Sequence, residues 1–244
     1  CHIASMTDTN LLLPMRTGEI RIHDAEGFEG MRRSGRLVAE CLDILLPEVK
    51  PGVTTEYLDR RVFEFVHDHG ATSATIGYRG YRHASCISVN HVICHGIPGP
   101  KALKDGDIAN IDVTLIIDGW HGDAAFTAGV GTISPEAQAL IAATEAALAA
   151  AVAAMVPGNR VGDVSAAVER VAEEHRYGLV DGYGGHGIGR KMHEDPDVPN
   201  IGTPGKGPRL LSGSVLAIEP MLVLGDPDVI ELTDGWTVVT KDRT

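Results

Sequence analysis

The chain contains Gly106-Asp107-Ile108-Ala109-Asn110-Ile111-Asp112 and, 107 positions later, Gly213-Ser214-Val215-Leu216-Ala217-Ile218-Glu219. In both stretches a glycine precedes an apolar, β-like run that contains one carboxylate at its end. An ionised carboxylate in such a run must be paired, hydrogen-bonded or bound to a metal, because stranding it away from water costs several kcal/mol. The two stretches therefore predict strands that present Asp112 and Glu219 to a polar site.

These stretches belong to a longer internal repeat. Pro51-Gly52 begins a segment that ends near His69, and Pro157-Gly158 begins a similar segment that ends near His175, always 106 positions apart. The matched apolar positions are Leu58, Val62 and Phe65 in the first segment and Val164, Val168 and Val171 in the second. A repeat on this scale predicts two similar halves. If the halves face each other across a pseudo-twofold axis, their acids meet in one central site.

A predicted β-hairpin places a second aspartate beside the first. Residues 108–117 are apolar and β-branched, Asp118-Gly119 is a strong turn signal, and residues 120–130 can return. With that turn residue 114 faces Asp123, so Asp112 lies one diagonal step away on the same face. Two carboxylates at this spacing can share one site or bridge two cations. The alternative interpretation is an exposed strand face that carries unrelated acids.

Two histidines extend the acidic set. His186 lies between glycines in residues 184–189, a stretch similar to Cys94-His95-Gly96-Ile97, and His193 follows seven residues later. Carboxylate oxygens together with imidazole suit Mn, Fe, Co or Zn better than a soft thiolate site does. The pattern predicts a metal-dependent hydrolase whose candidate ligands are Asp112, Asp123, His186, His193 and Glu219.

Composition narrows the class of protein. A chain of 244 residues can bury one substantial core, as a single domain or as two fused halves. The net charge of −12 argues against general nucleic-acid binding, although it leaves room for a local basic patch. The apolar runs are shorter than a membrane helix, and four cysteines without zinc-type spacing are too few for a disulfide framework. These features favour a soluble cytoplasmic enzyme with reduced cysteines.

The remaining pattern predicts helices between the strands. Helices are expected over residues 28–46, from a cap at Thr54 or Thr55 to Gly70, from Ser134-Pro135 to Met155, and from a cap at Asp163 to about His175. Strands are expected over residues 84–95, 107–117, 120–130, 178–186, 214–224 and 228–240. We interpret residues 1–18 as an N-terminal tail, in which Met6 is the true start and residues 1–5 are a non-native remnant.

Five motifs occur in order and with compatible spacing. They are Cys94-His95-Gly96-Ile97-Pro98, Asn110-Ile111-Asp112-Val113, Gly119-Trp120-His121-Gly122-Asp123, Gly185-His186-Gly187-Ile188-Gly189-Arg190-Lys191-Met192-His193-Glu194 and Ile218-Glu219-Pro220-Met221. Together they resemble the motifs of bacterial type I methionine aminopeptidases, and the similarity runs from about residue 19 to the end. The resemblance implies a pita-bread α/β fold, with two pseudo-symmetric halves, a central antiparallel sheet and outer helices. The halves would cover residues 19–130 and 131–244 of one catalytic domain.

The resemblance also implies an activity and a cofactor. The activity is removal of the initiator methionine from nascent proteins, preferably before a small second residue. The cofactor is a pair of divalent ions, Co, Mn, Fe or Zn, that lower the pKa of a bridging water so that it attacks the scissile carbonyl. Asp112 would bind one ion and Asp123 would bridge both. His186 and Glu219 would bind the other ion, with Glu219 also accepting the proton from the water.

The remaining site residues are implied to contact the substrate. His193 would stabilise the oxyanion and His95 would contact the substrate amide, tasks that suit imidazole near neutral pH. The methionine side chain would lie in an apolar pocket formed by Tyr78, Tyr81, Cys86, Met192 and Trp236. Together with His95 and His193, these residues form the expected substrate-binding set. The alternatives are a buried structural role for His95, an ordinary loop role for His193 and simple core filling for several pocket residues, Tyr81 and Met192 among them.

Two departures from the family pattern affect these expectations. In the family a second glutamate, which bridges both metals, lies on a last strand after the stretch matching Lys241-Asp242-Arg243, whereas this sequence reads to Thr244. We therefore expect either a truncated version of a longer enzyme, which we favour, or a shortened and inactive protein with an open sheet edge. Arg79 is the smaller departure, because the family commonly has a smaller polar residue at this position of the pocket rim.

Three other classes of protein share parts of the pattern. A prolidase-like peptidase has the same fold and metal set but usually carries a large extra N-terminal domain. A non-catalytic pita-bread protein would act as a binding module, and a non-haem iron oxygenase could use two histidines and one carboxylate, although the carboxylate-rich set fits it poorly. For the aminopeptidase, the expected partners are the N-terminal methionine of nascent chains and the ribosome. No membrane or specific nucleic acid is expected, and the chain is expected to be a monomer.

Overall fold

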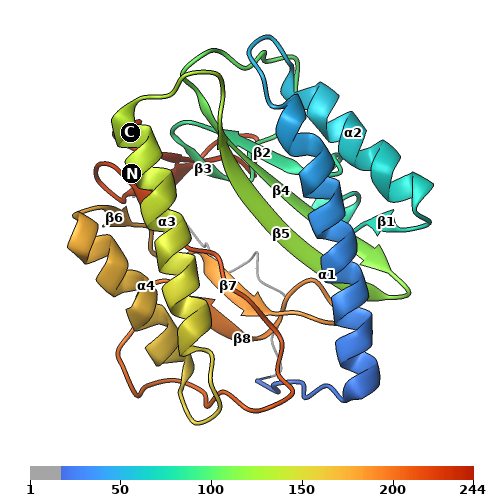
Figure 1. Ribbon diagram of the computed structural model, residues 1–244, viewed down its shortest axis with the longest axis vertical. Helices are drawn as coiled ribbons and strands as arrows, with labels where there is room; N and C mark the ends of the chain where they lie inside the picture. The colour runs from blue at the N-terminus through green and yellow to red at the C-terminus, as the bar shows by residue number, and fades with distance from the viewer. Residues whose placement is uncertain (1–17) are drawn as a thin grey trace, which may run out of the picture.

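The computed structural model describes residues 18–244, so the predicted tail lies outside the described residues except for Gly18. The described helices lie on the outside of the molecule, α1 and α2 at one side and α3 and α4 at the other, with strands between them (Figure 1). They are α1 (Ala25–Leu45), α2 (Thr55–Asp68), α3 (Pro135–Ala154) and α4 (Val161–His175), with short 3-10 helices at Leu46–Glu48 and Tyr78–Gly80.

The named strands pair antiparallel in four sheets. In the largest, β4 (Ile108–Ile117) pairs with β5 (Trp120–Gly129) along one edge and with β1 (Thr72–Ser73) and β2 (Cys86–Val89) along the other. The smaller sheets contain β10 (Leu222–Val223) with β6 (Gly178–Leu179); β12 (Val238–Thr240) between β11 (Val229–Glu231) and β3 (Val92–Cys94); and β7 (Gly184–Gly187) between β8 (Glu194–Pro199) and β9 (Leu216–Ala217).

The internal repeat of the sequence is visible in this architecture. α2 begins at Thr55 and α4 at Val161, which are 106 positions apart. β1 pairs with the far end of β4, and β6 pairs with β10 in the corresponding place of the second half. Each half has its own apolar core, one between α1, α2 and the largest sheet and one between α3, α4 and the strands of the second half. The site between the halves therefore lies between two independently packed cores.

Capping interactions explain where the helices begin. Two predicted caps are confirmed, because Thr54 caps α2 and Ser134 caps α3 with their side-chain oxygens. The predicted cap of α4 is wrong. This helix begins at Val161 after Arg160, and Asp163 lies one turn inside, where its carboxylate accepts the Arg160 N–H at 2.7 Å. An acid in the first turn can satisfy a free backbone N–H from within the helix, as in a capping box.

The second half contains shorter strands than the sequence predicts. The expected strand over residues 178–186 is divided into β6 and β7 by a turn in which Gly182 takes a φ of 82°. The expected strand over residues 214–224 is divided into β9 and β10. β8, at residues 194–199, was not predicted, because its two prolines and three acids conceal any alternation of apolar residues.

Among the described helices, α3 alone is long and apolar enough to cross a membrane. Helices in the core of soluble proteins can have the same length and composition. Its alanine-rich sequence favours helix strongly. Ala143, Ala147 and Ala151 recur every four residues on one face, and all three are buried in the core that α3 shares with α4. Small side chains on this face let the two helices pack closely.

Two of the three glycines of α1, Gly30 and Gly35, provide a matched test of how closely this helix packs against the rest of the fold. Gly30→Ala should lower the free energy of unfolding by about 1–3 kcal/mol, because the new Cβ would lie 2.2 Å from the Trp120 indole nitrogen. Gly35→Ala should instead raise it by up to about 1 kcal/mol, because nothing lies within 4 Å of that Cβ and alanine favours helix. Urea unfolding measures both changes. Equal effects of the two substitutions would contradict the packing described for α1.

Candidate metal centre

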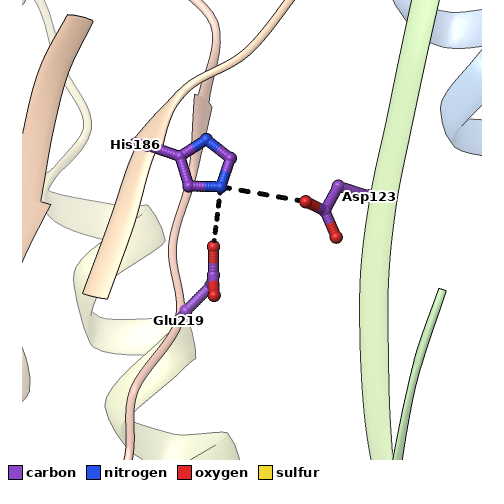
Figure 2. A group of neighbouring side chains, drawn as sticks. All are labelled: Asp123, His186 and Glu219. Atoms are coloured by element: carbon purple, nitrogen blue, oxygen red, sulfur yellow. Dashed lines mark ion pairs between the residues drawn. The ribbon is translucent and has the colours of Figure 1, made fainter. Parts of the chain in front are cut away.

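Three of the predicted ligands converge between the two halves. Asp123 points inward from β5, His186 from β7 and Glu219 from the segment after β9 (Figure 2). One possible ligand atom from each residue lies within 4.8 Å of the other two. His186 Nε2 is 3.8 Å from Asp123 Oδ2 and 3.1 Å from Glu219 Oε1. Both halves of the chain therefore contribute to one small site.

Asp112 lies beside this group on β4. The hairpin register is the one that the sequence predicts, because Thr114 opposes Asp123 and Asp112 opposes Ala125. Asp112 and Asp123 thus lie diagonally on the same face of the sheet. Burial, and then the charge of Asp123, hold the pKa of Asp112 well above its ordinary value. The four predicted ligands form a single acidic cluster around one imidazole.

The glycines of β7 fix the position of His186. A Cβ at Gly185 would lie 2.0 Å from the Ala217 carbonyl oxygen, and a Cβ at Gly187 would lie 2.2 Å from that of Asp195. β8 and β9 therefore approach this strand too closely for side chains on either side of the histidine. The imidazole is itself buried. Its place in the site is set by backbone contacts rather than by flexible side chains.

The hydrogen bond of His186 determines which ring nitrogen faces the acids. Nδ1 lies 2.9 Å from the Gly187 carbonyl oxygen, so this nitrogen carries a proton and donates it. Nε2 therefore faces Asp123 and Glu219. Within residues 18–244 the buried Oε1 of Glu219 accepts no hydrogen bond, although Nε2 is only 3.1 Å away. The site needs positive charge at this point, from a second proton on His186 or from a metal ion.

Electrostatics support the same conclusion. Burial, and then the charge of Glu219, raise the pKa of Asp123 to about 7. Burial alone would lower the pKa of His186, but the neighbouring Glu219 and Asp123 outweigh it and raise that pKa. The cluster thus binds protons strongly when no other cation is present. A divalent ion would keep the carboxylates ionised, so the donor set and its charge fit such an ion.

His193 reaches the site from the loop between β7 and β8. Its ring centroid is 4.3 Å from that of His186, and its Nδ1 is 3.3 Å from the Tyr78 hydroxyl oxygen. Tyr78 thereby connects His193 with the predicted methionine pocket. Met192, the preceding residue of the loop, is half-buried.

The other predicted pocket residues include two neighbouring aromatic rings and a buried thiol. The ring centroids of Tyr81 and Trp236 are 4.8 Å apart, and Trp236 meets His95 edge-on at 6.3 Å. Cys86 is buried and opposes Asp112 across β2 and β4. Burial lowers the pKa of His95, which favours its neutral form at pH 7. An aromatic and thiol surface thus borders the acidic cluster.

Two further residues near the site were not predicted. Asn200 donates a hydrogen bond of 2.8 Å to the Glu219 carbonyl and one of 3.4 Å to the Tyr183 carbonyl, which fixes the backbone that presents Glu219. The Tyr183 ring lies 6.1 Å from that of His95. Asn200 follows the unpredicted β8 and carries no local sequence signal. Tyr183 directly precedes the glycine stretch of His186, and that adjacency was the available signal.

The sequence profile of metallopeptidase family M24 matches residues 29–241. The chain belongs to metallopeptidase family M24. It is similar to the methionine aminopeptidase of Clostridium perfringens, with 48% identity over 212 residues that cover 87% of this chain and 85% of the relative. The predicted kinship with methionine aminopeptidases, and with it the class of metallo-exopeptidase, is confirmed. Membership of M24 implies bound divalent metal.

Solved structures lead to the same fold. The crystal structure of methionine aminopeptidase from Rickettsia prowazekii matches with a TM-score of 0.91 at 42% identity, covering 92% of this chain and 91% of that chain. The predicted pita-bread α/β fold is therefore confirmed. Prolidase from Pyrococcus furiosus matches with a TM-score of 0.74 at 20% identity, covering 89% of this M24 chain and 60% of that one. That likeness extends to the fold alone, so it does not favour the prolidase-like alternative.

The raised pKa of Asp123 predicts how pH affects the metal-free protein. The folded-state pKa of about 7 exceeds the ordinary value of 3.8, so folding favours the protonated carboxyl. That stabilisation is fully present below about pH 4 and is lost as pH rises through about 7. We therefore expect the free energy of unfolding of the metal-free wild type, compared with that of metal-free Asp123→Asn, to fall between these pH values. Urea unfolding of both proteins across this range measures the difference. If the free energies of unfolding of the two proteins change in parallel with pH, the raised pKa of Asp123 is contradicted.

Proposed function

We propose that this protein removes the initiator methionine from nascent polypeptides at a centre of two divalent ions. The proposal rests above all on the convergence of Asp123, His186 and Glu219 beside Asp112, in a chain of family M24. The relatives that carry the name methionine aminopeptidase support the choice of substrate. In this proposal Asp112 would hold one ion, His186 and Glu219 would hold the other, and Asp123 would be shared by both.

The residues of the chain provide orientation and proton transfer. Bound divalent ions lower the pKa of water and polarise a carbonyl group. Glu219, with its buried Oε1 free of hydrogen bonds within residues 18–244, accepts a proton and later delivers it to the leaving amine. His193, placed by its contact with Tyr78, donates a hydrogen bond to the carbonyl oxygen as negative charge develops. His95 contacts the substrate amide near the scissile bond.

The proposed pocket suits a methionine side chain. Tyr78, Tyr81 and Trp236 present aromatic rings, and thioether sulfur packs favourably against such rings. Cys86 and Met192 add soft, apolar surface. The lining is completed by His95 and His193, so the pocket adjoins the groups that act on the scissile bond. Arg79 lies over the Tyr78 ring, with its guanidinium carbon 5.4 Å from the centroid, and so borders this pocket.

The cellular setting follows from the substrate. Initiator methionine is present on chains as the ribosome makes them, so we place the enzyme in the cytoplasm with access to nascent chains at the ribosome. The oxygen and imidazole donors suit Mn, Fe, Co or Zn. We further propose that the protein works as a monomer, because both halves of the centre come from one chain.

Metal binding tests the proposed ligand set. Asp123→Ala should weaken binding of Mn²⁺ by about 100-fold or more, because the ligand shared by both ions is removed. Asp43→Ala, which removes an exposed acid from α1, should leave binding unchanged. Isothermal titration calorimetry at pH 7.5, on protein from which a chelator has removed bound metal, measures the affinities for Mn²⁺. Equal affinity in wild type and Asp123→Ala would exclude Asp123 as a ligand.

Peptide hydrolysis tests the substrate. Met-Ala-Ser should be cleaved to free methionine, whereas a Leu-Pro peptide should be cleaved much more slowly. Comparable rates would support the prolidase-like alternative instead.

The same assay tests the role of His193. His193→Ala should lower kcat by about 100-fold with a smaller change in KM, because the lost hydrogen bond is strongest in the transition state. His67→Ala, which removes an exposed histidine from α2, serves as the control and should leave both constants unchanged. A rise in KM at constant kcat would show that His193 binds the ground state.

A further inference from the structure

The loop that carries His193 is irregular. It joins β7 to β8 over residues 188–193, and the pairing of these two strands shifts register where the loop begins. Within it, the Gly189 N–H donates to the Lys191 carbonyl at 3.2 Å, and the Lys191 N–H donates to Glu194 Oε1 at 3.0 Å. A catalytic group misplaced by about 1 Å can cost about 100-fold in rate. Contacts with other parts of the chain must therefore hold this loop in place.

Arg190 supplies such a contact by reaching the other half of the molecule. Its guanidinium carbon lies over the Trp120 ring, 3.8 Å from the centroid, and Nη1 donates to the Asp118 carbonyl at 2.8 Å. Next to it, the His121 N–H donates to the Gly189 carbonyl at 2.9 Å. A planar guanidinium can stack on a ring and donate within its own plane at once, which an ammonium group cannot do. The loop is thus fastened to the tip of the β4–β5 hairpin.

Helix α1 holds that tip in place. Trp120 is 8% exposed and packs against Gly30, where any Cβ would overlap the indole. His23, just before the helix, meets the same indole edge-on with centroids 5.4 Å apart. Arg33 of α1 forms an ion pair with the Asp118 carboxylate. The surface on which Arg190 rests is therefore itself a packed and rigid part of the first half.

At its other end the loop places His193 against the site, with its ring 4.3 Å from that of His186. We propose that Arg190 is a positioning residue, which by stacking on Trp120 holds residues 188–193 so that His193 stays beside the metal centre. This inference rests on the proposed function, in which His193 contacts the developing oxyanion. Arg190 acts through His193, because its own guanidinium is engaged at the hairpin tip.

A double-mutant cycle with Met-Ala-Ser and Mn²⁺ tests this dependence. Arg190→Ala should lower kcat about tenfold with KM changed less than about twofold, because mainly the transition state loses its contact. In a His193→Ala background the same substitution should change kcat less than about twofold, because the residue that it positions is gone. Equal losses in both backgrounds, or an unchanged kcat in the first, would overturn the proposal.

Two matched variants separate positioning from charge and from folding. Arg190→Lys keeps the charge but loses the planar stack, so it should behave like Arg190→Ala, and it also replaces that variant if the alanine form does not fold. Arg32→Ala removes another exposed arginine, which pairs with Glu29 in the same helix, and should leave kcat unchanged. Affinity for Mn²⁺ should stay within about twofold in each variant, because the ligands lie outside the loop. A parallel loss of Mn²⁺ affinity would overturn the proposal by showing collapse of the centre.

Proton NMR of the imidazole groups gives a readout that is independent of activity. The His193 signal is identified by its loss in His193→Ala. In Arg190→Ala this signal should shift and broaden, whereas in Arg32→Ala it should not. An unmoved signal would show that Arg190 does not set the position of His193. If the wild type releases no methionine, the proposed function fails, and the NMR comparison still decides whether Arg190 positions His193.

Discussion

Repulsion among buried carboxylates is the constraint on which this structure depends. Asp112, Asp123 and Glu219 are brought together around a single imidazole, and burial and mutual charge raise the pKa values of both aspartates. Such a cluster does not assemble by its own attraction, so the rest of the fold must hold it. Two separate apolar cores do so, one in each half. Because a multiply charged cation would relieve the repulsion among these carboxylates, the site favours binding such an ion.

The two halves of the chain position the side chains of the site in different ways. The first half supplies a long, regular hairpin, in which ten cross-strand pairs fix the relative places of Asp112 and Asp123. The second half supplies short strands and tight backbone contacts, with His186 held between glycines and Glu219 held through Asn200. A regular hairpin sets distances along one face, whereas packed glycines set the approach of one strand to its neighbours. The site needs both, because its ligands come from different directions.

Sequence reasoning succeeded where the determining interaction is local or periodic. The turn at Asp118-Gly119 sets the hairpin register, and the repeat identified Glu219 as the counterpart of Asp112. Prediction from the sequence failed where a residue or strand depends on an interaction with a segment that is distant in sequence. β8 has no strand pattern of its own and exists because β7 pairs with it, and Asn200 matters only through the backbone of Glu219. The cap of α4 was misplaced by three residues, because an acid can satisfy the same N–H from outside or inside the helix. The engagement of Arg190 with Trp120 is likewise invisible without the folded chain.

The glycine strand around His186 has a consequence for anyone who wishes to alter this protein. Positions 185 and 187 cannot accept any side chain without moving a neighbouring backbone, since the space is filled by carbonyl groups of adjacent strands. A combinatorial library that randomises residues near the centre would therefore lose most of its members at these two positions, whatever activity is selected. Diversity is better introduced at the rim, where Arg79 and Met192 are more accessible than the strand. The strand around His186 must keep its glycines, whereas the rim of the site has room for other side chains.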